Sequence, residues 1–437
     1  MGGLRETFLS VIPVAPRSLN RPLSLRANFS WTFAGNLVYA GCQWGMLTAL
    51  AKLGTPEMVG RFSLGLAVTA PVFMLTNLQL REVQATDARH DYEFGHYLAL
   101  RLAMTTFALL AITTITILSG YRGEMIAVIL IIGLGKAFDS VSGAYHGLMQ
   151  QRERMDRIAL ALLIKGPLAL TALTVTVFIT GSVLWGVVAL AIAFAIVLFT
   201  YELSNARRLV SAEALKVIHP RWEWRRLAHL GWLALPLGLV MMLISLNTNI
   251  PRYFVERVLG EAELGLFVAM AYIKVAGNTV ASALGQSASP RLAQYYAQEQ
   301  RAAFRALLSR LVAIGLILGL STFLGALLFG RQVLTLLYRP EYAERPDVFA
   351  WLMVVAGIEY VASFLAYGMT AARRFRPQLP LLVITASITL VCCALWIPTL
   401  GLLGAAWALV CAALAKMIGS AYIVWRAWAR LPLSGGG

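Results

Sequence analysis

The sequence predicts an all-α, polytopic membrane protein in which twelve transmembrane helices form two six-helix lobes. Of its 437 residues, 59% are hydrophobic and only 13% are charged, whereas soluble domains carry roughly 25% charged residues. The apolar residues gather in stretches of about 20, the length that a helix needs to cross the hydrocarbon core. Because lipid offers no partner to unpaired backbone groups, these stretches must be helices rather than open strands.

Twelve such stretches follow one another along the chain, separated by short polar segments. We expect the spans at residues 28–51, 57–78, 97–119, 123–149, 157–180, 182–203, 227–247, 262–286, 303–329, 346–370, 378–398 and 402–426.

The longest hydrophilic segment has six spans on either side. The predicted organisation is a cytoplasmic lead-in, an N-terminal lobe, a central cytoplasmic linker, a C-terminal lobe and a cytoplasmic tail, at residues 1–27, 28–204, 205–226, 227–427 and 428–437. Because six is even, both lobes would enter the membrane from the same side, as parallel repeats do. A weak internal repeat agrees with this, with Leu53-Gly54, Glu57, Gly60 and Phe62 at the second span and Leu259-Gly260, Glu263, Gly265 and Phe267 at the eighth.

The net charge of +16 is explained by membrane topology. If the N-terminus is cytoplasmic, 26 of the 37 lysines and arginines fall in inside segments, eight (Arg252 among them) in outside segments, and three within spans. This is the positive-inside bias, and it predicts that both termini are cytoplasmic. A basic inner surface suits anionic headgroups, so membrane lipids are expected partners and nucleic acid is not.

No catalytic constellation is evident in the sequence. There is no P-loop, HExxH, GxSxG or metal-spaced Cys/His motif, and the four cysteines lie within predicted spans, where they act as packing residues. Every expected external segment is short, whereas a membrane-bound glycan polymerase or ligase would need a larger one. We therefore expect no enzyme activity, no cofactor and no metal site, and we keep the polymerase or ligase as a distant alternative.

Ionisable side chains near the centres of spans are the strongest indication of function. They are Lys136 and Asp139 in the fourth span, Lys274 in the eighth, Glu359 in the tenth and Lys416 in the twelfth. Each costs about 2.5–3.5 kcal/mol at a helix centre, so it persists only beside a wet cavity or a partner.

Polar and small residues accompany these charges at three- and four-residue steps, which place them on one face of a helix. The stripes comprise Ser140, Gly143, His146 and Gln150; Gly277, Asn278, Ser282, Gly285 and Ser289; Ser363, Tyr367 and Thr370; and, in the first span, Asn36, Tyr39 and Gln43. We interpret the stripes as the lining of a central aqueous cavity. Helix packing alone is the alternative for their glycines and serines.

Structural roles are also open for the charges themselves. Lys136 and Asp139 could neutralise each other, and Glu359 could pair with Lys136 or Lys274 and lock the two halves together.

Three further ionisable residues are expected near the cytoplasmic surface. Lys165 and Glu202 would be interfacial, and His146 would lie about one turn from the edge, where a proton relay is the less favoured interpretation. Lys416 is expected to snorkel toward the interface.

Lysines on several faces of a cavity favour an anionic solute. Lys274 has no acidic neighbour on its own stripe, and Arg81 stands at the cytoplasmic mouth of the second span. A phosphate would gain charge-assisted hydrogen bonds from such groups. The residues alone therefore predict a secondary transporter of an anionic solute.

Several segments resemble the bacterial O-antigen and exopolysaccharide flippases, the polysaccharide transporters of the multidrug/oligosaccharidyl-lipid/polysaccharide (MOP) exporter superfamily. The residues that carry the resemblance are 53–57, 60–62, 77–87, 147–155, 337–343, 371–375 and 401–406. Each segment alone is a weak motif, but their order and spacing cover nearly the whole chain.

The resemblance implies a V-shaped pair of six-helix lobes that works by alternating access in the bacterial inner membrane. It implies as substrate an oligosaccharide linked through pyrophosphate to undecaprenol, moved from the cytoplasmic to the periplasmic leaflet, and a polysaccharide polymerase as a candidate partner.

The family has no fixed motif for the site. From their positions we expect Lys274, Lys136, Arg81, Asn278, Asn36 and Gln43 to bind pyrophosphate and sugar, and Asp139 and Glu359 to gate transport or to couple it to a proton or sodium ion. A cation-coupled multidrug exporter of the same superfamily is the alternative.

Overall fold

The computed structural model describes residues 24–87, 89, 91–209, 219–374 and 376–429. Nearly all of the predicted lead-in and tail, and about half of the predicted linker, lie outside the described residues. Within this part the chain forms helices and no strands, which confirms the all-α prediction.

The N-terminal lobe contains the helices that precede the linker. They are α2 (Leu25–Leu53), α3 (Pro56–Thr76), α4 (Leu80–Thr86), α5 (Phe94–Leu118), α6 (Glu124–Gln151), α7 (Met155–Thr180), α8 (Val183–Val197), the π-helix η1 (Leu198–Glu202) and α9 (Leu203–Leu209).

The remaining helices follow the linker. They are α10 (Trp224–Leu259), α11 (Glu261–Tyr272), α12 (Lys274–Ala297), α13 (Arg301–Leu337), the 3₁₀ turn η3 (Pro340–Ala343), α14 (Pro346–Ala371), α15 (Gln378–Leu400) and α16 (Leu402–Ala429). Each of the twelve predicted spans coincides with one or more of these helices.

Helix boundaries follow from proline and glycine. Pro56 and Pro346 occupy the first position of their helices, where the missing N–H is not needed. Gly181 ends α7 with a φ of +63°. Glycine adopts this left-handed conformation at little cost because it has no Cβ.

Eleven helices of the described part are long and apolar enough to cross a membrane, so the protein is a multi-pass membrane protein. The first predicted span, α2, is not among the eleven. Polar residues such as Asn28, Asn36 and Gln43 interrupt its apolar sequence, which lowers its hydropathy.

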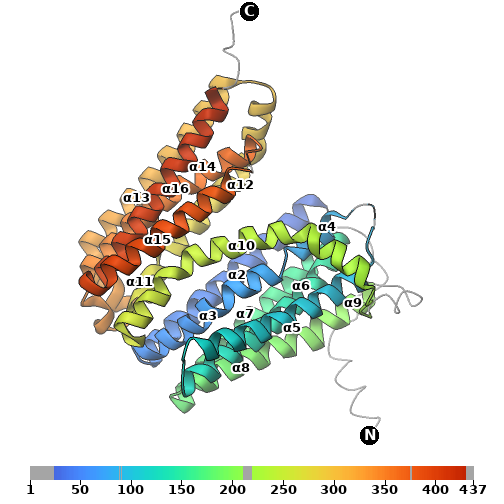
Figure 1. Cartoon of the computed structure of the whole chain (residues 1–437), viewed down its shortest axis with the longest axis horizontal. Helices are drawn as coiled ribbons and strands as arrows, with labels where there is room; N and C mark the ends of the chain where they lie inside the picture. Colours follow the sequence, from blue (N-terminus) through green and yellow to red (C-terminus); the bar gives the residue numbers. More distant parts are fainter. Residues whose placement is uncertain (1–23, 88, 90, 210–218, 375, 430–437) are drawn as a thin grey trace, which may run out of the picture.

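The helices form two lobes that diverge from a shared end (Figure 1). Helices α2 to α9 pack together, and α11 to α16 form the second body, in which α14 contacts α12, α13 and α16. Helix α10 bridges them, because Leu227 and Leu230 at its start pack on Tyr97 and Leu100 of α5, while its later part contacts α3 and α15.

The lobes touch where α3 crosses α11, through two glycines of the predicted repeat. A Cβ on Gly60 would lie 1.9 Å from the carbonyl oxygen of Glu261, and a Cβ on Gly265 would lie 1.9 Å from that of Pro56. Only glycine allows the two backbones to approach so closely. Each repeat thus packs on the first turn of the other, the reciprocal contact expected of two related halves.

Polar contacts reinforce this junction, which we call the closed end. Arg61 of α3 reaches Glu124 of α6 and Glu261 of α11, each at 2.6 Å. The Nε of Arg339 also donates to the carbonyl oxygen of Lys52 at 3.0 Å. The lobes are therefore joined at the end that the charge bias assigns to the outside, and they diverge toward the opposite end.

Candidate functional site

A cavity of about 160 Å³ lies between the lobes beside the closed end. Its polar lining within the described part comprises Gln43 of α2, Ser63 of α3, Lys136 of α6, Arg252 of α10 and Tyr272 of α11. A second cavity of about 300 Å³ shares Lys136 and Arg252 and adds the polar side chains Ser245, Thr248 and Asn249 of α10. The two cavities therefore meet at a pair of cations.

Neither cation of this pair lies in direct contact with a carboxylate of the described residues, although Lys136 acts on Asp139 at longer range. Lys136 and Arg252 take part in none of the ion pairs formed there. Arg252 donates from Nη1 to Oδ1 of Asn249 at 3.1 Å, a neutral partner that orients the guanidinium. A cavity with two cations that have no ion-pair partner attracts an anion and offers it charge-assisted hydrogen bonds.

Arg252, which the charge count placed in an outside segment, lies within a helix. Helix α10 continues well beyond residue 247, where the predicted span ends, and runs to Leu259. Two asparagines and Pro251 in this stretch are residues typical of loops. However, Asn247 and Asn249 each donate from Nδ2 to the carbonyl oxygen four residues earlier, at 2.9 and 2.8 Å. These bonds satisfy the polar side chains within the helix, and the helix continues.

Lys274 and Glu359, both predicted site residues, form an ion pair in the second lobe. The Lys274 Nζ lies 3.0 Å from Oε2 and 3.2 Å from Oε1 of Glu359. Both side chains are largely buried, with 16% and 26% exposed. The predicted pairing with Lys274 is present, but it joins α12 to α14 of one lobe, so the expectation that it locks the two halves together is wrong.

The glycines of the α12 stripe serve close packing. Tyr360 and Tyr367 of α14 lie over Gly277 and Gly285, where an added Cβ would approach their side chains to within 2.0 and 2.2 Å. The hydroxyl of Tyr360 donates to the carbonyl oxygen of Lys274 at 3.2 Å. Part of the predicted polar stripe is thus a helix contact rather than a cavity wall.

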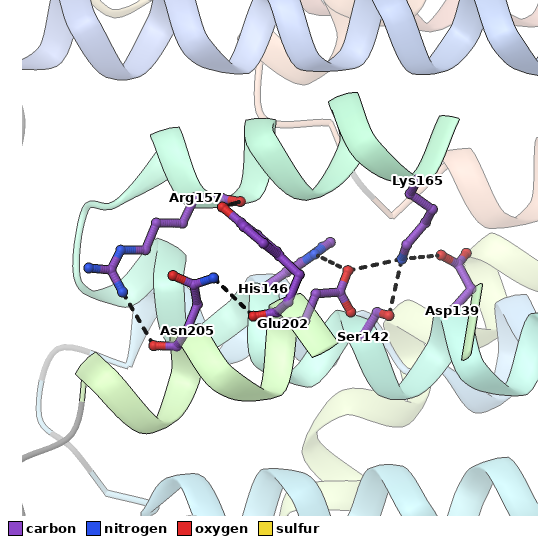
Figure 2. A network of polar contacts seen from close by, with 8 residues as sticks. Asp139, Ser142, His146, Arg157, Lys165, Glu202 and Asn205 are labelled. Carbon is purple, nitrogen blue, oxygen red and sulfur yellow. Dashed lines mark hydrogen bonds and ion pairs between the residues drawn. The ribbon is translucent and has the colours of Figure 1, made fainter. Parts of the chain in front are cut away.

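A buried charge cluster occupies the interior of the N-terminal lobe (Figure 2). The ammonium of Lys165 lies 3.3 Å from Asp139, 3.1 Å from Glu202 and 3.1 Å from the hydroxyl of Ser142. The Nε2 of His146 lies 3.0 Å from the same Glu202 oxygen, Oε1. We call Asp139, Ser142, His146, Lys165 and Glu202 the N-lobe cluster.

The expectation that Lys165 and Glu202 are interfacial is wrong. Both side chains have no exposed surface, because α7 turns Lys165 toward α6, and the π-helix η1 carries Glu202 toward the same face. The partner of Asp139 is Lys165 and not Lys136, which leaves Lys136 to the cavity.

Arg81 lies on the short helix α4, beyond a break in the backbone. Leu78 and Gln79 adopt φ values of 50° and 49°, a conformation that is strained for side-chain-bearing residues. The break redirects the chain toward α6, where the Nε of Arg81 donates to Oε1 of Gln150 at 2.9 Å.

Asn77, directly before this break, is held by hydrogen bonds from α6 and α5. Its Oδ1 accepts hydrogen bonds from Ser140 Oγ at 2.7 Å and from the guanidinium of Arg101. Arg101 is only 3% exposed, although the charge bias assigned it to an inside segment. The polar residues of α6 therefore face three different neighbours, with Ser140 toward α3 and α5, Asp139 toward α7, and Lys136 toward the cavity.

The structure thus brings together only part of the predicted set. Lys136 and Gln43 line the cavity with Arg252, whereas Asn36 is exposed on α2. Arg81, Asn278 and Lys274 line neither of the two cavities.

Two divergent helical lobes with a polar cavity between them make the chain a multi-pass helical membrane protein with the fold of solved membrane transporters. The fold is similar to that of a multidrug resistance MATE family transporter of the MOP superfamily in an inward-facing conformation, with a TM-score of 0.67, 18% identity, and coverage of 90% of this chain and 94% of that one. It is also similar to the lipid II flippase MurJ in an inward closed conformation, with a TM-score of 0.70, 12% identity, and coverage of 91% of this chain and 87% of that one.

The family follows from the sequence match. The family model described as "Polysaccharide biosynthesis protein" matches residues 25–296, which is more than half of the chain, and the chain belongs to this family. The capsular polysaccharide biosynthesis protein CapF of Staphylococcus aureus is 27% identical over 384 residues, which cover 87% of this chain and 94% of CapF. The resemblance predicted from the sequence motifs is confirmed.

Proposed function

We propose that the protein flips undecaprenyl-pyrophosphate-linked oligosaccharides from the cytoplasmic to the periplasmic leaflet of the bacterial inner membrane, by alternating access, for polysaccharide biosynthesis. The observation that carries the proposal is that Lys136 and Arg252, two cations without an ion-pair partner among the described residues, line the cavity between the lobes. A pyrophosphate diester carries about two negative charges near neutral pH and would be stabilised by these two groups through charge-assisted hydrogen bonds. The family and the similarity to the lipid II flippase MurJ support the same class of substrate.

The rest of the cavity suits the other parts of such a substrate. Gln43, Ser245 and Asn249 offer hydrogen bonds to sugar hydroxyls. The polyprenyl chain would stay in the bilayer beside the diverging lobes. Both termini would be cytoplasmic, and the closed end would then face the periplasm.

The proposed site therefore centres on Lys136, Arg252 and Gln43. In this conformation Lys274 forms an ion pair with Glu359. Arg81 lies outside the cavity, so it would contact the pyrophosphate only in another arrangement of the lobes. Asn36 and Asn278 would contact the glycan under the same condition.

A cation-coupled multidrug exporter is the second candidate, favoured by the similarity to the MATE fold. A cavity for a cationic drug would present carboxylates, whereas the charged groups of this cavity within the described part are a lysine and an arginine. This difference favours the flippase.

The test is reconstitution of the full chain in vesicles with a fluorescent undecaprenyl-pyrophosphate-linked oligosaccharide in the inner leaflet. We expect the wild type to expose the glycan to a membrane-impermeant reagent, and Lys136→Ala/Arg252→Ala to lower this rate at least about 100-fold, since each charged hydrogen bond contributes about 1.5–3 kcal/mol. Arg257→Ala, an exposed position on the same helix, is the matched control and should keep the wild-type rate. Efflux of a cationic dye without movement of the glycolipid would establish the exporter instead.

A further inference from the structure

A groove of about 460 Å³ lies between α2 and α7 of the N-terminal lobe. We call it the α2–α7 groove. Its lining within the described part comprises Trp44, Gly45, Thr48, Ala49, Lys52, Leu170, Thr171, Thr174 and Val175. None of these residues lines either cavity between the lobes. The groove is therefore separate from the site that the proposed function uses.

Small residues of α2 make room for the groove. Gly45 and Ala49 are four residues apart and share one face of the helix. An added Cβ on Gly45 would lie 3.2 Å from the side chain of Leu170, so α2 and α7 are in close contact at this point. The apolar side chains of Trp44, Leu170 and Val175 complete the wall. Most of the groove therefore suits a hydrocarbon chain.

Two hydroxyl groups of the groove lack a hydrogen-bond partner. The Oγ1 atoms of Thr48 and Thr174 are buried and have no partner in the described part of the chain. By contrast, the buried Thr116 and Thr389 each donate to the carbonyl oxygen four residues earlier, at 2.7 and 2.8 Å. A buried polar group without a partner is costly. One such hydroxyl from each helix, in the same groove, points to a ligand that accepts hydrogen bonds.

The two hydroxyls lie at a similar depth in the membrane. Thr48 precedes the end of α2 at Leu53 by five residues, and Thr174 precedes the end of α7 at Thr180 by six. The charge bias assigns both of these helix ends to the outside. Rotation about χ1 between staggered rotamers turns each hydroxyl toward the groove. A ligand between the two helices can therefore accept from both threonines in the outer half of the bilayer.

A cation stands at the outer end of the groove. Lys52 lies one turn beyond Thr48 on the same face of α2, about 6 Å nearer the outer surface at 1.5 Å per residue. It takes part in none of the ion pairs formed by the described residues. Arg339 of the second lobe lies beside it, because its Nε donates to the Lys52 carbonyl oxygen at 3.0 Å. Positive charge thus lies at the surface, with hydroxyl donors one turn deeper.

This order of groups matches the chemistry of a glycerophospholipid. Such a lipid carries a phosphate at the surface, ester carbonyls one glycerol unit deeper, and acyl chains below them. The phosphate suits the ammonium of Lys52, and the ester carbonyls accept hydrogen bonds from threonine hydroxyls. The acyl chains suit the apolar wall of the groove. A polyprenyl phosphate has no ester carbonyl and would leave both hydroxyls unpaired.

We propose that the α2–α7 groove binds a glycerophospholipid of the outer leaflet, with its phosphate on Lys52 and its ester carbonyls on Thr48 and Thr174. Because Arg339 belongs to the second lobe and lies beside Lys52, the bound phosphate also adds a contact at the closed end. The site goes beyond the proposed function and does not depend on it. Lys52 meets the phosphate only when lipid is bound, so Lys52→Met unfolds like the wild type in lipid-free detergent.

The experiment titrates the delipidated full chain in detergent with two lipids and counts bound lipid by native mass spectrometry. Dioleoyl phosphatidylglycerol carries ester carbonyls, and its diether analogue has the same headgroup and chains without them. The wild type should bind the ester lipid about tenfold more tightly, since the ether lipid loses two neutral hydrogen bonds. Thr48→Val/Thr174→Val, which keeps the side-chain shape, should remove this preference. Thr106→Val/Thr114→Val, two exposed threonines of α5 that donate to their own helix, is the matched control and should keep it.

Three outcomes would overturn the lipid site. They are equal affinity of the wild type for the two lipids, a preference that survives in Thr48→Val/Thr174→Val, and displacement of the ester lipid from the wild type by an equal concentration of undecaprenyl phosphate. The last result would assign the groove to a polyprenyl chain. None of the three bears on flipping through Lys136 and Arg252, which the vesicle assay tests separately.

A second measurement locates the lipid on the wild type and needs no variant. Phosphatidylglycerol with a photoreactive diazirine near the start of an acyl chain should label peptides that contain residues 44–52 and 170–175, which line the groove. An excess of the ester lipid should suppress this labelling more than the same excess of the ether analogue. Labelling confined to other helices would overturn the proposal.

Discussion

The two lobes bury their charges in different ways. The second lobe holds one cation against one anion, Lys274 with Glu359, and this pair is balanced. The N-terminal lobe holds two carboxylates against one ammonium and a histidine, and between the lobes stand two cations without an anion. The comparison teaches that a group of buried charges indicates a ligand when its positive and negative charges do not cancel. The presence of buried charge alone does not. On this reasoning the cavity takes an anion, and the pair in the second lobe needs no ligand.

The largest expected effect is the loss of the central cation of the N-lobe cluster. Lys165→Met leaves Asp139 and Glu202 without their shared partner, and breaking a buried ion pair costs about 3–5 kcal/mol. The variant should therefore unfold at a clearly lower temperature in detergent, while Lys52→Met, an exposed lysine on α2, should not. Lys165→Met/Glu202→Leu should regain part of the loss. An unchanged melting temperature for the single variant would mean that the cluster contributes little to stability.

A smaller effect is expected for the balanced pair. Lys274→Met should lower the melting temperature and the flipping rate, because it leaves Glu359 unpaired, and Lys274→Met/Glu359→Leu should restore both, since apolar replacement of a whole buried pair is often neutral. The readouts are thermal unfolding and the vesicle assay. If Lys274 itself received the pyrophosphate, the double variant would be stable and still inactive.

The smallest effect is expected at the closed end. Arg61 and Glu261, the ion pair that joins α3 to α11, are each about one third exposed, and pairs of this kind contribute about 0–1 kcal/mol. Arg61→Gln should therefore shift the balance between closed and open lobes by no more than about fivefold, with little change in melting temperature. Distances between spin labels on α3 and α11 would measure this balance. If α3 and α11 separated completely in the variant, the glycine contact would not be the main junction between the lobes.

The arrangement of helices could be predicted from the sequence because it depends on local signals. The span expected at 346–370 is α14, Pro346–Ala371, since proline starts the helix and hydropathy defines its length. The glycines of the repeat were visible as well, although their reciprocal packing was not.

The site could be predicted only in part, because depth along a helix does not tell which neighbour a side chain faces. Lys165 and Glu202 lie close to the ends of their predicted spans, and nothing in their spacing shows that both turn toward α6. Arg252 was missed because the predicted span ended at residue 247, whereas α10 continues to Leu259. Asn247 and Asn249 look polar in the sequence, but they bond to carbonyl oxygens of their own helix.

Binding of undecaprenyl pyrophosphate to the purified protein in detergent tests the central claim most directly. The wild type should bind it far more tightly than undecaprenol, which lacks the phosphates, and Lys136→Gln/Arg252→Gln should bind it at least about 100-fold more weakly. Equal affinity of the wild type and this double variant would contradict the assignment of the pyrophosphate to the cavity between the lobes.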